Sequence, residues 1–148
     1  MSETIKLCCA QCGQTNRIPA ERMKQGPKCG TCGAPLADGK PMELDAKAHD
    51  RSVKQDGLPL IVDYWAAWCG PCRAMAPEYA KAAQEMKGEV RFGKLDTEAN
   101  PQIAQRARIQ GIPSLILYHR GREVGRLTGA RPASQITDFI RQTVGQKA

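Results

Sequence analysis

The sequence contains few aromatic residues, only 5%, and no hydrophobic run approaching the roughly 20 residues that a membrane-spanning helix needs. It begins MSETIKLCCAQC, which has neither the apolar stretch nor the cleavage site of a signal peptide. A nucleic-acid-binding surface usually combines clustered cations with aromatic side chains. Here the excess of positive charge, a net +7, is spread over both the first 40 residues and the remainder. We therefore expect a cytoplasmic protein with neither a membrane nor a nucleic acid as its partner.

Histidine is also scarce, with two residues, whereas cysteine is abundant, with seven. Six of the cysteines form three Cys-x2-Cys pairs, at 9–12, 29–32 and 69–72. Thiols stay reduced in the cytosol, so pairs with this spacing are more often metal-binding or catalytic there than structural disulfides. The surroundings of each pair must decide between these two roles.

Composition changes along the chain and divides it into two parts. Residues 1–40 are rich in Cys, Gly, Pro and Lys and show no long apolar periodicity. A segment of that length usually needs a metal or disulfides to fold. The stretch APLADGKP, residues 34–41, is typical of a loop and linker. We expect a small domain over 1–40 and a domain with its own hydrophobic core over 41–148.

The second part alternates helical and strand patterns. Patterning predicts helices over 46–57, 71–88, 100–109 and 131–144, and strands over 58–66, 90–96, 114–119 and 122–129. Pro77 falls inside the second helix and should kink it. Strands separated by helices favour parallel pairing, and the closely spaced last two strands favour a hairpin. The fold class is α/β, a mixed central sheet with helices on both faces.

The first two cysteine pairs have the spacing of a four-cysteine zinc site. Sixteen residues separate Cys9-x2-Cys12 from Cys29-x2-Cys32, and glycine follows each pair. Four thiolates fill all positions of a tetrahedral ion, so the site should be structural. The alternatives are two disulfides or four idle thiols. Cys8 could replace Cys9 in a less regular register, but we expect it to be a spare thiol. Chelation should unfold residues 1–40 and leave the rest folded.

The third pair, Cys69-Gly70-Pro71-Cys72, lies where a buried strand meets a helix. No fourth pair is near it, and only His49 and His119 could complete a metal site. Cys69 falls at the helix N-terminus, where the helix dipole stabilises a thiolate, and Cys72 is close enough to form a disulfide with it. This arrangement indicates redox chemistry, the alternative being a buried pair without function.

The segment VDYWAAWCGPCRAMAP closely resembles the active-site segment of the thioredoxin family, and the resemblance covers about residues 45–148. Asp63 and Lys94 match the buried aspartate of the family and its lysine partner, and GIPS at 111–114 matches the cis-proline loop. The turn and groove glycines of the family are matched at Gly121 and Gly129. The resemblance implies a thioredoxin fold, although the short first strand of that fold is not obvious before residue 45. Residues 1–40 resemble the zinc ribbon of bacterial thioredoxin 2 proteins.

Functional roles follow from this resemblance. Cys69 and Cys72 would be the redox pair, and Asp63 would exchange a proton with Cys72 because burial raises its pKa. Lys94 would tune Asp63; the alternative is a purely structural acid paired with Lys94. Trp65 would pack beneath the site. The resemblance implies a cis Ile112–Pro113 bond and a substrate-binding surface made of Trp68, Gly70, Pro71, Ile112, Pro113 and Gly129.

The implied activity is a cytosolic protein-disulfide reductase, because a Gly-Pro dipeptide between the cysteines goes with reducing members of the family. An NADPH-dependent thioredoxin reductase would recharge it, and its clients would include ribonucleotide reductase, peroxiredoxins and methionine sulfoxide reductases. We expect a monomer with one structural zinc ion and no organic cofactor. The alternatives are a zinc-ribbon interaction module with a redox-regulated chaperone activity, and a disulfide isomerase or oxidase. The ribbon could select partners, orient the domain or sense oxidants.

Overall fold

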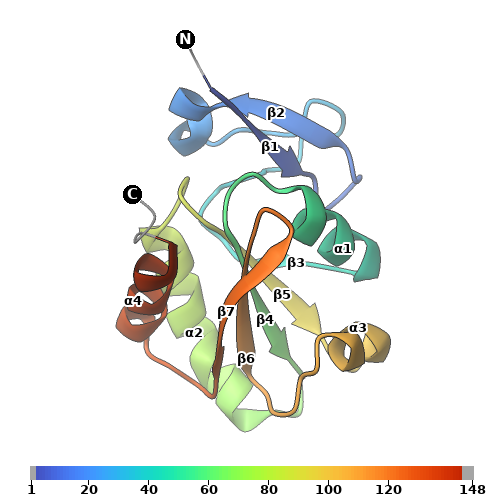
Figure 1. Cartoon of the computed structure of the whole chain (residues 1–148), viewed down its shortest axis with the longest axis vertical. Helices are drawn as coiled ribbons and strands as arrows, with labels where there is room; N and C mark the ends of the chain where they lie inside the picture. The colour runs from blue at the N-terminus through green and yellow to red at the C-terminus, as the bar shows by residue number, and fades with distance from the viewer. Residues whose placement is uncertain (1–2, 145–148) are drawn as a thin grey trace.

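A computed structural model describes residues 3–144 of the chain. A small N-terminal unit sits at one end of a larger α/β unit (Figure 1). The small unit pairs β1 (Thr4–Cys8) antiparallel with β2 (Thr15–Pro19), and the short 3-10 helix η1 (Ala20–Gln25) follows. Within residues 3–144, no helix is long and apolar enough to cross a bilayer.

The larger unit is built on a five-stranded mixed sheet with the strand order β3-β5-β4-β6-β7. Its strands are β3 (Met42–Glu43), β4 (Leu60–Trp65), β5 (Arg91–Asp96), β6 (Ser114–His119) and β7 (Arg122–Thr128). Its helices are α1 (Ala46–Gln55), α2 (Gly70–Glu85), α3 (Pro101–Arg106) and α4 (Ala133–Val144). β5 runs parallel to β3 and β4, whereas β6 runs antiparallel to β4 and β7.

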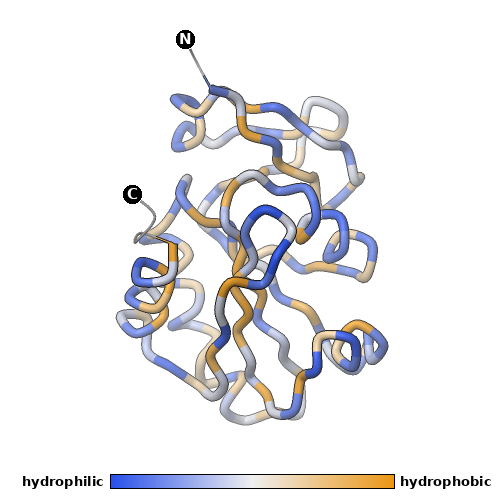
Figure 2. Tube along the Cα trace, viewed as in Figure 1, coloured by the Kyte–Doolittle hydropathy of each residue, from blue (hydrophilic) through white to orange (hydrophobic). Residues whose placement is uncertain are grey.

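Alternation along the central strands creates two hydrophobic layers. Ile61 of β4 packs in one layer with residues of α2 and α4, whereas Val62 packs in the other with residues of α1 and α3. Successive strand side chains point to opposite faces, so a strand covered by helices on both sides is apolar at nearly every position. Figure 2 shows hydrophobic colour along the central strands and hydrophilic colour over much of the helices. This is the thioredoxin fold that the sequence predicts.

The predicted elements are present, but the first three helices end earlier than their patterns indicate, whereas α4 ends at Val144 as predicted. The first predicted helix continues to 57, whereas α1 ends at Gln55 because Asp56 adopts an extended backbone. The third continues to 109, whereas α3 ends at Arg106, and Arg108 has a φ of 59°. Pro77 lies inside α2, as predicted. The strand that the sequence left obscure is β3, which has only two residues and pairs with β5.

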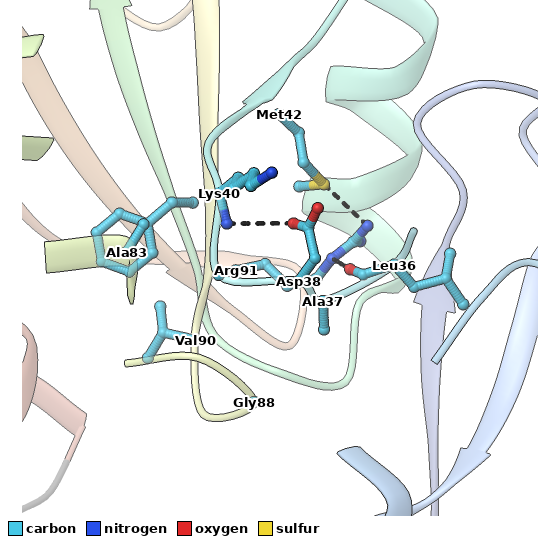
Figure 3. Close-up of a pocket in the computed structure, with 11 residues that line it drawn as sticks. Leu36, Ala37, Asp38, Lys40, Met42, Ala83, Gly88, Val90 and Arg91 are labelled. Atoms are coloured by element: carbon cyan, nitrogen blue, oxygen red, sulfur yellow. Dashed lines mark hydrogen bonds between the residues drawn. The ribbon is translucent and has the colours of Figure 1, made fainter. Parts of the chain in front are cut away.

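A buried ion pair joins the small unit to the larger one. Arg91 Nη1 of β5 donates to Asp56 Oδ2 at 2.7 Å, and both side chains are 1% exposed. Asp56 Oδ1 accepts from the backbone N–H of Cys8, and Arg91 donates to the carbonyl of Cys8. Arg91 also donates to Leu36 O in the linker and to Met42 Sδ at the start of β3, beside the small pocket of Figure 3. These five contacts are called the junction below.

A chain of buried hydrogen bonds connects three elements on the α1 face. His49 Nε2 of α1 lies 2.8 Å from the hydroxyl of Tyr64 on β4. That hydroxyl lies 2.7 Å from the hydroxyl of Tyr118 on β6. At the other ring nitrogen, His49 lies 2.9 Å from Asp50 Oδ1, which also accepts from Arg106 of α3. Polar groups buried on an otherwise apolar face are satisfied by one another here.

Candidate redox site and candidate metal centre

Cys69 and Cys72 form a disulfide at the N-terminus of α2, with their Cα atoms 5.2 Å apart. Cys69 is the N-cap residue, and its Sγ accepts a hydrogen bond of 3.2 Å from the backbone N–H of Cys72. Pro71 suits the first helical turn, where its missing N–H costs nothing. The positive end of the helix dipole and this N–H group favour a thiolate at Cys69 over one elsewhere in the helix.

An open groove borders the disulfide. Of the predicted substrate-binding residues, Trp68, Gly70, Pro71 and Ile112 line it together with Cys69. Trp68 is 64% exposed, and its Nε1 donates to Glu98 Oε2 at 2.7 Å. The remaining lining residues were not predicted: Thr97, Ala104, Ile109, Gln110 and Gly111.

The loop before β6 brings backbone groups to the disulfide. The Ile112–Pro113 peptide bond is cis, as predicted, and Ile112 O lies 3.8 Å from Cys69 Sγ. Pro113 is buried, and its carbonyl accepts a 2.8 Å hydrogen bond from the N–H of Gly129. Gly129 has a φ of 96°, which favours glycine at this position. Pro113 and Gly129 therefore support the loop, and Ile112 presents its backbone beside the cysteines.

Asp63 is a buried acid on the same side of β4 as Ile61, which packs against α2. It is 1% exposed, and its Oδ1 has no hydrogen-bond partner among the described residues. Burial raises the pKa of Asp63 to about 7, and the nearby Lys94 opposes that rise. Within residues 3–144, no ion pair joins Asp63 to Lys94, whose ammonium lies 4.5 Å from the centre of the Trp65 ring. Burial therefore outweighs the charge of Lys94 in setting the pKa of Asp63.

The four cysteines of the first two pairs converge within the small unit. The Sγ atoms of Cys9, Cys12, Cys29 and Cys32 all lie within 4.8 Å of one another, and two of the distances are 3.6 Å. A tetrahedral zinc ion with bonds of about 2.3 Å requires sulfur atoms about 3.8 Å apart. The spacing of the thiols therefore fits one metal ion.

Matching turns shape this cluster. Gly13 and Gly33 have φ values of 85° and 79°, and their N–H groups donate to the carbonyls of Cys9 and Cys29. Glycine at these positions lets the chain reverse without strain and brings the second sulfur of each pair back toward the first. The N–H of Thr31 also donates to the Sγ of Cys29 at 3.4 Å.

Cys8 lies outside the cluster and is fully buried. Its Sγ lies 3.8 Å from the carbonyl oxygens of Cys9 and Gly13, and burial raises the pKa of its thiol. The backbone of Cys8 belongs to the junction, through Asp56 and Arg91. Cys9 rather than Cys8 therefore supplies the sulfur that faces the other three.

Three residues that shape the site and its support were missed from the sequence: Asp56, Arg91 and Glu98. Each depends on a partner at least 30 positions away in the chain. Charged residues at strand and helix ends are ordinary in a sequence, so no local pattern marks them. The one available signal was Arg91 itself, a cation at the start of a strand whose next position is the apolar Phe92.

Two family profiles match the chain. One described as "Thioredoxin" matches residues 40–142, and one described as "Thioredoxin 2, N-terminal" matches residues 8–34. The chain belongs to the thioredoxin family. It is a thiol–disulfide oxidoreductase of the thioredoxin 2 type, with an active-site cysteine pair and an N-terminal zinc ribbon.

Individual thioredoxins are similar over most of the chain. "Thioredoxin C-3" of Corynebacterium nephridii is 36% identical over 141 residues, which are 95% of this chain and 97% of that protein. The "Bifunctional thioredoxin reductase/thioredoxin" of Mycobacterium leprae is 35% identical over 65% of this chain and 22% of its own length. Among solved structures, chloroplastic thioredoxin z superposes with a TM-score of 0.66 at 31% identity, over 72% of this chain and 96% of its own.

Proposed function

We propose that this thioredoxin is a protein-disulfide reductase that works through the dithiol form of Cys69-Gly70-Pro71-Cys72. The observation that carries the proposal is the placement of the pair. Cys69 caps α2 at the edge of an open groove, and Asp63 is a buried acid on the strand face that α2 covers. A nucleophile at the surface with a proton acceptor held beneath it suits two-step exchange with a client disulfide.

The exchange is proposed to run in two steps. The Cys69 thiolate attacks one sulfur of the client disulfide, and the client S–S bond breaks. The second client sulfur leaves as a thiolate and takes a proton from solvent. Cys72 then gives its proton to Asp63, through water, and attacks the Cys69 sulfur. The mixed disulfide breaks, the client becomes a dithiol, and two electrons have left the protein, which now holds the Cys69–Cys72 disulfide.

Asp63 supports the second step because its pKa of about 7 lets it accept and release a proton near neutral pH. Lys94 is proposed to tune this pKa by its charge rather than by a direct ion pair. Trp68, Gly70, Pro71 and Ile112 would contact the client segment, with the backbone of Ile112 pairing with it as with an added strand. Pro113 and Gly129 would hold that backbone in place.

The oxidised pair needs a source of electrons, and an NADPH-dependent thioredoxin reductase is the proposed partner. The Mycobacterium leprae relative, named as a bifunctional thioredoxin reductase/thioredoxin, supports this pairing. Ribonucleotide reductase, peroxiredoxins and methionine sulfoxide reductases are the proposed clients. The proposed setting is the cytosol, where thiols are kept reduced, and the proposed state is a monomer.

One zinc ion is proposed as the resident of the four-cysteine cluster, because the sulfur spacing suits it and four thiolates complete its coordination. Cys9, Cys12, Cys29 and Cys32 would hold it in a structural role. We propose residues 1–40 as the ribbon and 41–148 as the thioredoxin domain, with no organic cofactor in either.

The proposal is tested by the reduction potential of Cys69/Cys72 in zinc-loaded protein, equilibrated against a defined dithiol buffer. A reductase should have a potential near about −270 mV. A value of about −180 to −120 mV would instead identify an isomerase or an oxidase. Cys69→Ser should lose turnover of a disulfide-linked peptide with a thioredoxin reductase, and full activity in that variant would contradict the role of Cys69.

A further inference from the structure

We infer that this chain prefers client segments with an acidic residue near the reacting cysteine, which Arg108 recognises in a hollow continuous with the dithiol groove. The inference rests on the proposed function, since it names the class of client for the same groove.

The hollow adjoins the groove directly. Its lining residues come from the end of α3, from the segment that follows it and from β7: Arg106, Ala107, Arg108, Gln110, Glu123 and Arg126. Gln110 lines both the hollow and the dithiol groove. A client segment long enough to fill the groove past Gln110 therefore reaches the hollow.

Two of the three arginines are already neutralised. Arg126 donates to both carboxylate oxygens of Glu123, at 2.7 and 2.8 Å, and to the carbonyls of Ala107 and Arg108. Arg106 forms an ion pair of 2.7 Å with Asp50. Arg108 is exposed, and its guanidinium has no acidic partner among the described residues. The net charge available to a bound segment at this end is therefore that of Arg108.

The groove itself has an acid at its edge that is already engaged. Trp68 lines the groove, and its indole N–H donates to the carboxylate of Glu98. Arg108 in the adjoining hollow has no acidic partner among the described residues. A cation available beside the groove favours a client segment that carries an acid.

The backbone holds Arg108 in place at the rim. Its φ of 59° lies in the left-handed region, which is uncommon for residues other than glycine, asparagine and aspartate. Arg126 fixes the same turn by donating to the Ala107 and Arg108 carbonyls at 3.1 and 3.5 Å. The backbone that carries Arg108 is therefore held by hydrogen bonds from Arg126.

The experiment compares reduction of short disulfide-linked peptides by zinc-loaded full-length protein. Aspartate, serine or lysine is placed in turn at each of the three positions before and after the reacting cysteine. At one position or more, kcat/KM should be about two- to fivefold higher for aspartate than for serine, as expected of an exposed ion pair. The preference should shrink as salt is added.

Arg108→Ser should abolish the aspartate preference, and Arg108→Glu should reverse it in favour of lysine, while both variants reduce the serine peptides at the original rate. Arg120→Ser is the matched control. Arg120 is also an exposed arginine with a positive φ, 56°, but it lies at the opposite end of β6 from Ser114, the residue after the cis-proline.

An aspartate preference that survives in Arg108→Ser, one lost equally in Arg120→Ser, or the absence of any charge preference would each overturn the inference. The serine peptides separate this outcome from failure of the proposed function. If the parent protein does not reduce them, the reductase proposal fails instead.

Discussion

Asp63 combines a functional position with a cost to the fold. The folded protein holds a proton on this carboxyl up to a pKa of about 7, whereas an exposed aspartate loses it near 3.8. Between these two values the folded state binds more protons than the unfolded state, so stability falls as pH rises through this window. Above pH 7 the full cost of a buried carboxylate is present.

Asp63→Asn should therefore stabilise the protein by about 4 kcal/mol at pH 8, and by only about 0.5 kcal/mol at pH 4. Urea unfolding of the oxidised protein at the two pH values measures the difference. The same variant should slow the resolution of a mixed disulfide near pH 7, because Cys72 loses its proton acceptor. A stability gain that is equal at both pH values would show that Asp63 is not charged in the folded protein at pH 8.

Arg108 has a backbone conformation that suits glycine better than arginine. Arg108→Gly should raise stability by about 0.5–1 kcal/mol, because relief of left-handed strain exceeds the entropy cost of glycine in the unfolded chain. Chemical denaturation measures this gain. Arg141→Gly is the contrasting control, since Arg141 lies in α4 and glycine costs about 1 kcal/mol inside a helix. A loss of stability in both variants would contradict the strain argument.

At the scale of elements, the His49–Tyr64–Tyr118 chain fixes α1 and β6 to β4. Tyr64 stands in the middle, with hydrogen bonds to both of the others. Removing its hydroxyl leaves two buried polar groups without this hydrogen-bond partner, and each buried group left unpaired costs about 1–3 kcal/mol. Removing the Tyr118 hydroxyl leaves neither of the other two groups without a partner, because the Tyr64 hydroxyl still hydrogen-bonds with His49.

Tyr64→Phe should therefore cost more stability than Tyr118→Phe. In the Tyr64→Phe background, Tyr118→Phe should be neutral or stabilising, because it deletes a hydroxyl that has already lost its partner. A double-mutant cycle by urea denaturation checks this sign change. Simple addition of the two single effects would mean that the hydroxyls act independently.

The elements that could be predicted from the sequence are those with a local pattern. β4 is an apolar run interrupted only by Asp63, Pro71 lies in the first turn of α2, and the redox pair falls where the two elements meet. The fold and the dithiol could therefore be predicted together. β3 could not be predicted, because two residues show no alternation and its pairing with β5 depends on Gly93 and Lys94.

In the candidate site, too, only the features with a local pattern could be predicted from the sequence. The Cys-x2-Cys spacing predicted which sulfurs gather in the ribbon, and the cis bond at Pro113 came from a motif. The partners of Trp68 and Cys8 could not be predicted, since Glu98 and Arg91 reach them only through the tertiary fold. The end of α3 at Arg106 was missed because the pattern continues through the left-handed Arg108.

At the scale of the whole molecule, the junction changes what metal removal should do. From the sequence, chelation was expected to unfold residues 1–40 alone. In the structure, Asp56 of the buried Arg91–Asp56 pair accepts a hydrogen bond from the ribbon backbone at Cys8, and Arg91 donates to the carbonyls of Cys8 and of Leu36 in the linker. A buried ion pair that loses its hydrogen-bond partners is destabilising. Unfolding of the ribbon should therefore also lower the free energy of unfolding of the larger unit.

Removal of the metal by a chelator should lower the free energy of unfolding of the thioredoxin part by about 1–3 kcal/mol. Both tryptophans of the sequence lie at 65 and 68, so their fluorescence reports on that part. The control is Asp56→Leu/Arg91→Met, which replaces the ion pair by apolar side chains and should reduce the effect of chelation. If the free energy of unfolding measured by tryptophan fluorescence is the same with and without metal, the two units fold independently.

The junction also orders events while the chain is being made. The ribbon cysteines leave the ribosome before Asp56, which lies 48 residues beyond Cys8, and before Arg91, which lies 83 residues beyond it. The nascent ribbon can bind its metal early but cannot dock until β5 has emerged. In a cell short of zinc, each new chain would fold its thioredoxin domain while the ribbon before it stayed unfolded. The Arg91–Asp56 pair would then lack its contacts with the ribbon from the moment the chain left the ribosome.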